Sequence, residues 1–257
     1  MIIFAQPRHL YDSYQDFRAL VQLAGFPLIY VDEIPREGVR ENVYILSPLN
    51  GEWQNGIRTD GRVIWWDLEW RCEGDFPRIP GVSEVWTSDA WYAAKTGTRY
   101  VPMGSDKRLR LTPDRIPTEY DAAYLGYMVN RRSAIQHELR ARGLRITGHG
   151  AWGIERDYVL NASTVYLHVH QLDQAPGVPA LRMVVAAAYG LPVISETVAD
   201  VGIFGHAFLQ CVYGRLGEFV QLWARDQHPQ MRENYGHSLH TLLCEKLTFR
   251  KSVEDAL

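Results

Sequence analysis

The run Trp65–Trp70 places indole rings next to carboxylates where a predicted strand ends. Aromatic faces stack sugars or bases, and a carboxylate can take a proton from a hydroxyl group. Asp67 is therefore the first candidate for a general base and Glu69 the second, while Trp66 and Trp70 are candidates for stacking an acceptor. The alternative is that the tryptophans belong to the core and the acids pair with nearby arginines.

A second group of candidates lies after four predicted strands in the other half of the chain. Open α/β sheets bind ligands beyond the carboxyl ends of their strands, so residues at these positions are the ones to weigh. Asp89 is a further acceptor-side candidate in the first half, although it could instead cap a helix. The donor-side candidates are Gly126, Asn130, Arg131, His149, Trp152, His170, Arg182 and Glu196.

Arg182 is the strongest of these candidates. Residues 164–170 predict a strand, and Pro179 suits the first position of a small-residue helix that Gly190 ends. The N-terminus of such a helix attracts anions, and an arginine in an Ala/Val-rich helix needs an anionic partner. Arg131 or Arg132, after another strand, offers a second phosphate contact, but both could equally be solvated arginines on a capped helix.

Other motifs in this half are weaker. Gly148–Gly153 matches the GxGxxG pattern, but no clear helix opens directly after it, so a loop that holds a nucleobase through Trp152 is preferred. His168 and His170 lie on one face of a strand, which suits core histidines better than a zinc site, because no convincing third ligand follows. We expect no bound metal and no permanent cofactor.

The segment Asn161–Glu196 resembles the nucleotide-sugar-binding half of GT-B glycosyltransferases, specifically the group that includes spore-maturation-type proteins. The residues that carry the resemblance are His170, Arg182, Ala186, Ala188, Gly190, Pro192 and Val193. It implies a nucleotide-sugar donor, most simply a UDP-sugar, whose diphosphate is held near Arg131 and Arg182. Val185 stands where that group has a glutamate for the donor ribose or sugar, and Glu196 and His149 are the nearest substitutes.

Composition limits the class of protein. The 257 residues are 46% hydrophobic and 22% charged, as in globular proteins, and neither an apolar run of membrane-spanning length nor a cleaved leader is evident. Three distant cysteines predict no disulfide framework and suit a reducing cytoplasm, so we expect a cytoplasmic protein without membrane contact. Between residues 104 and 148, nine Lys/Arg face five Asp/Glu, although the whole chain carries −3. This basic segment could meet nucleotide phosphates or nucleic acid, or could be a solvated helix surface.

Strands that alternate with helices predict an α/β protein with two Rossmann-like parallel sheets, the GT-B architecture, in which the first domain is reduced. The expected domains are residues 1–110 on the acceptor side, 118–235 on the nucleotide-sugar side, and a C-terminal helix over 236–257 that crosses back. Strands are expected at 2–5, 27–31, 43–46, 61–66, 82–87, 122–127, 144–147, 164–170, 191–195 and 208–212, and helices at 14–24, 133–142, 155–160, 180–189 and 216–224, with more beyond residue 228.

The expected activity is transfer of a sugar from a nucleotide donor to a hydroxyl group. A hydroxymethylated pyrimidine in DNA is the best single acceptor, because enzymes that act on a base flip it out and stack it on aromatic rings. A small molecule, glycan or protein acceptor stays open. So do a nucleotide-sugar epimerase and an inactive nucleotide-sugar-binding protein, for which Val185 is the main argument.

Overall fold

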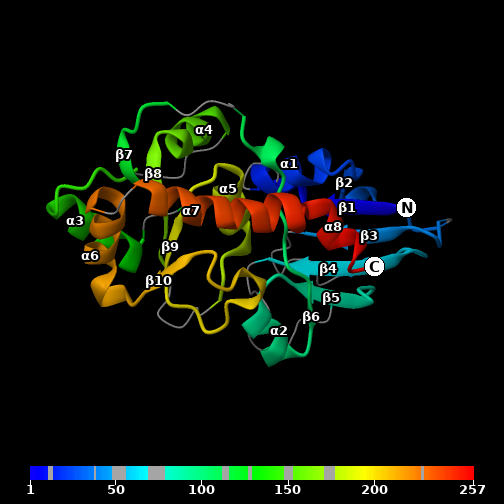
Figure 1. Ribbon diagram of the computed structural model, residues 1–257. Coiled ribbons are helices and arrows are strands. Elements are labelled where there is room, and N and C mark those ends of the chain that lie inside the picture. The colour runs from blue at the N-terminus through cyan, green and yellow to red at the C-terminus, as the bar shows by residue number, and fades with distance from the viewer. Residues whose placement is uncertain are drawn as a thin grey trace.

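The protein forms two lobes, each built on a parallel β-sheet (Figure 1). The computed structural model describes residues 1–10, 14–37, 39–47, 56–68, 79–111, 116–126, 129–147, 153–170, 177–226 and 229–257. The predicted α/β class and two-sheet architecture are confirmed. Within the described ranges, no helix is long and apolar enough to cross a lipid bilayer.

The first sheet has the strand order β2-β1-β3-β4-β5-β6, and all its pairings are parallel. Strands buried on both faces read as continuous apolar runs, which is why the sequence predicted most of them. The strands are β1 (Ile2–Gln6), β2 (Leu28–Tyr30), β3 (Val43–Leu46), β4 (Arg62–Asp67), β5 (Glu84–Thr87) and β6 (Arg99–Tyr100). Helix α1 (Gln15–Leu23) follows β1, and α2 (Ala90–Thr96), the helix that Asp89 was expected to cap in its alternative role, follows β5.

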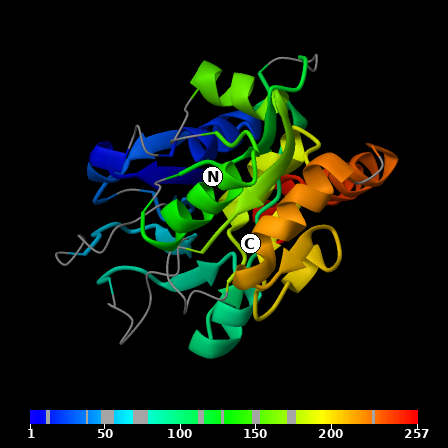
Figure 2. The same ribbon diagram turned by 90° about the vertical axis from the view of Figure 1, so that its left-hand side faces the viewer.

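The second sheet has the parallel order β10-β9-β8-β7. Its strands are β7 (Tyr120–Ala123), β8 (Ser163–His168), β9 (Val193–Glu196) and β10 (Leu209–Cys211). Its helices are α3 (Arg131–Ala141), α4 (Gly153–Asn161), α5 (Ala180–Ala188) and α6 (Leu216–Gln221), and α6 continues into a π-helical turn, Leu222–Asp226. Figure 2 shows α4, in light green, and α2, in teal, at opposite extremes of the molecule.

The strand predicted at 144–147 is wrong: only one bridge, between Ala122 and Ile146, forms there. Side chains bond part of the backbone that a strand ladder would use. Asp121 Oδ2 accepts the Arg145 amide at 2.7 Å, and Thr147 Oγ1 accepts the Tyr124 amide at 2.8 Å. Short polar side chains compete with regular pairing in this way.

The C-terminal segment joins the two lobes, as expected for a helix that crosses back. Helix α7 (Pro229–His240) runs on through a π-helical turn, Thr241–Lys246, to α8 (Phe249–Glu254), and Figure 1 shows this segment crossing from one lobe to the other. Ser105 forms a parallel bridge with Thr248. Phe249 is 1% exposed, and its ring centroid lies 5.7 Å from those of Phe4 and Trp66. The tail is therefore part of the core of the first lobe.

Candidate functional site

The donor-side candidates meet at the carboxyl edge of the second sheet. Gly126 follows β7 with φ +120°, a conformation open mainly to glycine, and a Cβ built there would lie 2.8 Å from Arg182 Nη2. Arg182 lies in the first turn of α5, a helix that is mostly buried because its other residues are all apolar. The missing side chain of Gly126 therefore gives the Arg182 guanidinium its room.

Arg182 fixes the protonation state of His168 at the end of β8. Its Nη1 lies 3.0 Å from His168 Nδ1. Because an arginine can only donate, Nδ1 must be the acceptor, and the ring proton must be on Nε2. Burial, reinforced by the Arg182 charge, holds the pKa of His168 well below its usual value. His168 is 3% exposed, and its Nε2 has no hydrogen-bond partner among the described residues, so it offers a buried N–H.

His170 lies beside His168 and presents a hydrogen-bond acceptor where His168 presents a donor. Its ring meets the His168 ring edge-on, with the centroids 5.1 Å apart. His170 Nε2 lies 3.4 Å from the Thr197 carbonyl oxygen and therefore donates to it, which leaves Nδ1 as an acceptor without a partner in the described chain. Burial lowers the pKa of His170, although the nearby Glu196 carboxylate opposes this effect. The two histidines thus present one donor and one acceptor.

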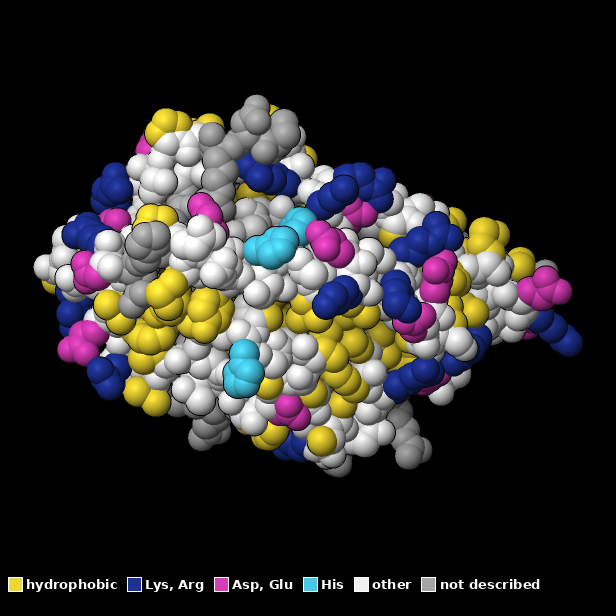
Figure 3. Space-filling model, in the orientation of Figure 1, with side chains coloured by type: hydrophobic (Ala, Val, Ile, Leu, Met, Phe, Trp, Pro, Cys, Tyr) yellow, Lys and Arg dark blue, Asp and Glu magenta, His cyan; other side chains and the backbone are white. Residues whose placement is uncertain are grey.

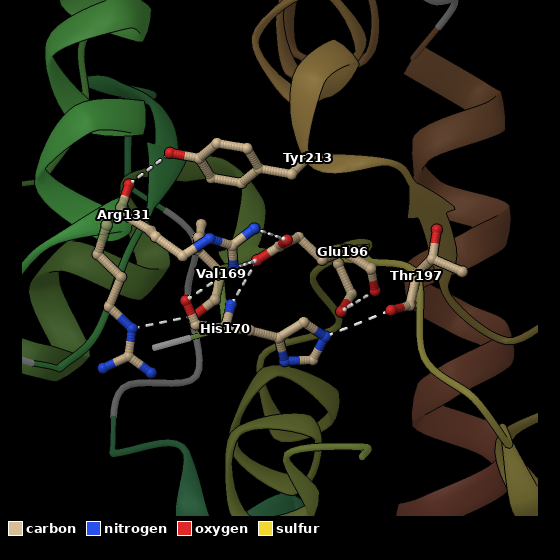
Figure 4. A network of polar contacts seen from close by, with 8 residues as sticks. Arg131, Val169, His170, Glu196, Thr197 and Tyr213 are labelled. Carbon is tan, nitrogen blue, oxygen red and sulfur yellow. Dashed lines mark hydrogen bonds and ion pairs between the residues drawn. The ribbon is translucent and has the colours of Figure 1, made fainter. Parts of the chain in front are cut away.

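Glu196 is bound to Arg131 (Figure 4). Arg131 donates to both carboxylate oxygens, at 2.7 and 3.1 Å, and the His170 amide donates to Glu196 Oε2 at 2.7 Å. The Arg131 guanidinium lies 4.0 Å from the ring centroid of Tyr213, whose hydroxyl donates to the Arg131 carbonyl at 2.9 Å. In this arrangement both Glu196 and Arg131 are satisfied by each other. Tyr213 was not predicted, because nothing in the sequence links positions so far apart.

Two further features stand at the start of α3. Arg132, the alternative to Arg131 as a phosphate contact, is 7% exposed and donates through Nε to the Val169 carbonyl at 3.0 Å. Burial and the neighbouring Arg182 charge lower the pKa of Arg132. Asn130 is exposed, its side chain does not cap the helix, and its φ of 50° is positive, which is unusual for a residue other than glycine.

The electrostatics of this edge favour an anion. Arg132 and Arg182 are close enough for the charge on Arg182 to disfavour the charge on Arg132. No carboxylate pairs with Arg182 in the part of the chain that the structure describes. An anion placed between these groups would relieve the repulsion and would accept from the buried His168 N–H.

The first lobe contributes Asp67 and Asp89 at the carboxyl ends of β4 and β5. Asp67 is 3% exposed and is in register with Thr87. Asp89 is completely buried: Oδ1 accepts the Tyr92 amide at 2.7 Å, which caps α2, and Oδ2 accepts the Val178 amide of the second lobe at 2.6 Å. Burial raises the pKa of Asp89. Asp89 therefore ties the two lobes together, a position different from the expected acceptor contact.

Trp66 also lies inside the protein. It is 0% exposed, and its ring stacks on that of Phe249 at an interplanar angle of 27°. Trp66 is therefore a core residue, which was the alternative interpretation of the sequence, and its buried ring is not available to stack an acceptor. Val185, at the position of the expected family glutamate, is 2% exposed within the same core. The other candidates, Glu69, Trp70, His149 and Trp152, lie outside the described residues.

In the described ranges, no three His, Cys, Asp or Glu side chains lie close enough together to bind a metal ion.

Comparisons by sequence give little. No protein-family model matches the chain. One curated protein, the uncharacterized protein L140 of Acanthamoeba polyphaga mimivirus, is 31% identical over 83 residues; the match covers 32% of this chain and only 27% of that relative's length.

Among the solved structures with a similar fold, two illustrate the likeness. One is the DNA-modifying enzyme β-glucosyltransferase, studied with and without its substrate uridine diphosphoglucose; it is 11% identical with a TM-score of 0.53, and the match covers 100% of this chain and 98% of that one. The other is AviGT4, a glycosyltransferase of avilamycin A biosynthesis, which is 10% identical with a TM-score of 0.57 and coverage of 99% and 96%. The chain therefore has the GT-B fold that the sequence predicted.

Proposed function

We propose that the protein is a glycosyltransferase that transfers a sugar from a UDP-sugar to an acceptor hydroxyl group, and that the acceptor is a hydroxymethylated pyrimidine in DNA. The observation that supports the first part is a group of positively charged and N–H donors at the carboxyl edge of the second sheet. Arg182, Arg132 and the buried His168 N–H converge there, beside the N-terminus of α5. A diphosphate is the anionic part of such a donor.

In this proposal the acceptor oxygen attacks the anomeric carbon of the sugar while the bond from that carbon to the diphosphate oxygen breaks. Asp67 takes the hydroxyl proton, and the negative charge that develops on the leaving diphosphate is stabilised by the guanidinium of Arg182 and the N–H of His168. Donors already in place where charge develops lower the barrier without costly reorganisation. Glu196 and Tyr213 hold Arg131 at the rim of this site.

Support for a DNA acceptor is of a different kind. One protein of the same fold is a DNA-modifying β-glucosyltransferase. The segment 104–148 carries an excess of positive charge in an otherwise acidic chain, which suits a phosphate backbone. With Trp66 in the core, an acceptor base would have to stack elsewhere, and Trp70 is the remaining candidate of the run Trp65–Trp70.

The test is a transfer assay. The protein is incubated with UDP-glucose, with and without duplex DNA that contains hydroxymethylcytosine, and both free UDP and a mass gain of the DNA are measured. We expect Arg182→Ala to lower kcat/KM about 100-fold, the loss of a charge-assisted contact in the transition state. Arg215→Ala, at an exposed arginine on the surface, is the matched control and keeps wild-type activity. Full activity of Arg182→Ala would refute the site.

One observation favours a second candidate, an inactive nucleotide-sugar-binding protein. Val185 replaces the expected glutamate and is packed in the core, and Glu196 is engaged by Arg131. Such a protein would bind UDP with an affinity that depends on Arg182, yet would release no UDP from UDP-sugars with any acceptor. The same assay, combined with a UDP titration, separates the two functions.

A further inference from the structure

The guanidinium of Arg182 is held by neutral side chains, whereas cations on the surface lie beside acids. Figure 3 shows Lys and Arg side chains interspersed with Asp and Glu on the face that α7 and α8 cross, and in α8 Arg250 pairs with Glu254 at 2.7 Å. Arg182 instead donates to His168 Nδ1 at 3.0 Å and to the hydroxyl of Tyr124. A neutral acceptor orients a guanidinium without cancelling its charge, so Arg182 keeps its attraction for an anionic ligand.

Tyr124 reaches Arg182 from the end of β7, where it is 1% exposed. The central guanidinium carbon of Arg182 lies 5.9 Å from the Tyr124 ring centroid, within the range of a cation–π contact. A Cβ built at Gly126 would lie 2.8 Å from Arg182 Nη2 and 3.8 Å from the Tyr124 hydroxyl oxygen, so both groups lie at the same glycine. Burial raises the pKa of Tyr124, and its hydroxyl therefore stays neutral near pH 7.

Thr147 fixes the backbone of Tyr124. Thr147 Oγ1 accepts the Tyr124 amide at 2.8 Å and donates to the Tyr124 carbonyl oxygen at 3.0 Å. Thr147 is itself 5% exposed, its amide donates to the Ala122 carbonyl at 3.3 Å, and its carbonyl accepts from the Gln136 side chain at 3.3 Å. These bonds stand where the strand predicted at 144–147 would have paired with β7. The irregular segment thus sets the position from which Tyr124 reaches Arg182.

We infer that Tyr124 is a positioning residue for the donor diphosphate and that Thr147 sets its place. This inference deepens the proposed function and rests on Arg182 as the diphosphate contact. Tyr124 acts through Arg182, because contacts with Tyr124 and His168 together hold the guanidinium in one orientation before the ligand arrives. A donor that is already oriented loses little rotamer freedom when it binds the anion or stabilises developing charge.

Tyr166 of β8 provides a matched control. It is 0% exposed, and the charge of Arg182 acts on its hydroxyl as it does on that of Tyr124. The Tyr166 hydroxyl has no hydrogen-bond partner among the described residues, so Tyr166→Phe removes the same atom without removing a bond to Arg182. Because an unpartnered buried hydroxyl is costly, the Tm of this variant should equal or exceed that of the parent.

The experiment is a double-mutant cycle read by calorimetric titration with UDP, which needs neither an acceptor nor turnover. We expect Tyr124→Phe to weaken UDP binding about threefold to tenfold, the cost of immobilising one more long side chain on binding, whereas Tyr166→Phe binds UDP as the parent does. In the Arg182→Ala background, Tyr124→Phe should cause no further loss, because the residue that it positions is gone. A merely structural role of Tyr124 would weaken UDP binding equally in both backgrounds.

Substitutions of Thr147 test the second half of the inference. Thr147→Val removes the hydroxyl and nearly conserves the shape, and we expect it to lose as much UDP affinity as Tyr124→Phe does. Thr147→Ser keeps the hydroxyl and should recover the affinity of the parent. Thermal unfolding shows whether each variant is folded, and Tyr124→Phe decides the matter should Thr147→Val fail to fold.

The outcomes separate this inference from the proposed function. Equal losses for Tyr124→Phe in both backgrounds, or no loss in the parent, would overturn the inference, and the transfer assay would still decide the proposed function. The expected cycle in a protein that transfers no sugar would support the positioning role of Tyr124 and refute the transferase. If UDP does not bind the parent, the donor site and this inference are both wrong.

Discussion

Replacing Gly126 by alanine tests the arrangement of the donor-side site most directly. The new Cβ would lie 2.8 Å from Arg182 Nη2, so the guanidinium must retreat by roughly 0.7 Å to reach an ordinary separation of about 3.5 Å. A charge-assisted hydrogen bond stretched by that amount is largely lost, which is worth about 1.5–3 kcal/mol, or about 10- to 150-fold in affinity. The φ of +120° adds strain of about 1–3 kcal/mol to the folded state.

The assays are a UDP titration by calorimetry and thermal unfolding. Gly97→Ala is the matched control, because Gly97 also has a positive φ, of 69°, but nothing lies within 4 Å of the position that its new Cβ would take. We expect both variants to lose about 2–4 °C in Tm per kcal/mol of strain, whereas only Gly126→Ala loses UDP affinity. If Gly126→Ala binds UDP as tightly as Gly97→Ala does, the reasoning about Arg182 is wrong.

Three further predictions follow from the described contacts. Asp67→Asn should lower kcat about 10²- to 10⁴-fold in the transfer assay while the affinity for UDP is retained. If kcat and UDP affinity fall by the same factor, Asp67 is not the general base. Gly236→Ala should lower the free energy of unfolding, because its Cβ would lie 2.0 Å from the Gly190 carbonyl oxygen. The overpacking costs about 1–3 kcal/mol, which outweighs a helix-propensity gain of about 1 kcal/mol. Gly214→Ala is the control, because a Cβ there would have nothing within 4 Å, and it should not lower the stability. Because burial raises the pKa of Asp89, the folded state binds its proton more tightly than the unfolded state, so this group stabilises the protein at low pH and loses that contribution as pH rises through the raised pKa. The stability of the wild type relative to Asp89→Asn, measured by urea unfolding from about pH 4 to pH 7, should therefore fall as pH rises, and an opposite slope would contradict this sign.

Much of the fold was predictable because its strands are buried on both faces. Runs such as Ile2–Ala5 and Leu191–Ile194 contain no charged or hydrogen-bonding side chain, and the helix over Ala180–Ala188 has a proline before it and a glycine after it. Pairing near Arg145 was not predictable, since it depends on Asp121 accepting an amide from a segment far along the chain.

The donor side was partly predictable for a geometric reason. Parallel strands end at one edge of a sheet, so Gly126 and Arg182 were expected there, and a Cβ added at Gly126 would lie against Arg182 Nη2. The direction of each side chain was not. An indole next to a carboxylate has the same sequence pattern whether it stacks a ligand or a core ring, and only the folded chain shows that Trp66 packs against Phe17, Trp86 and Phe249. The pairing of Glu196 with Arg131 likewise needed the folded chain.

The position of Phe249 bears on the order of events during synthesis. Phe4, Phe17 and Trp66 of the first lobe pack against a ring that is translated only after the whole second sheet. Domains usually fold as they emerge, with the N-terminal one first. Here the second sheet, whose strands lie between Tyr120 and Cys211, can be complete while the first still exposes an aromatic surface. The nascent first lobe would then be the part of this chain that depends on chaperones.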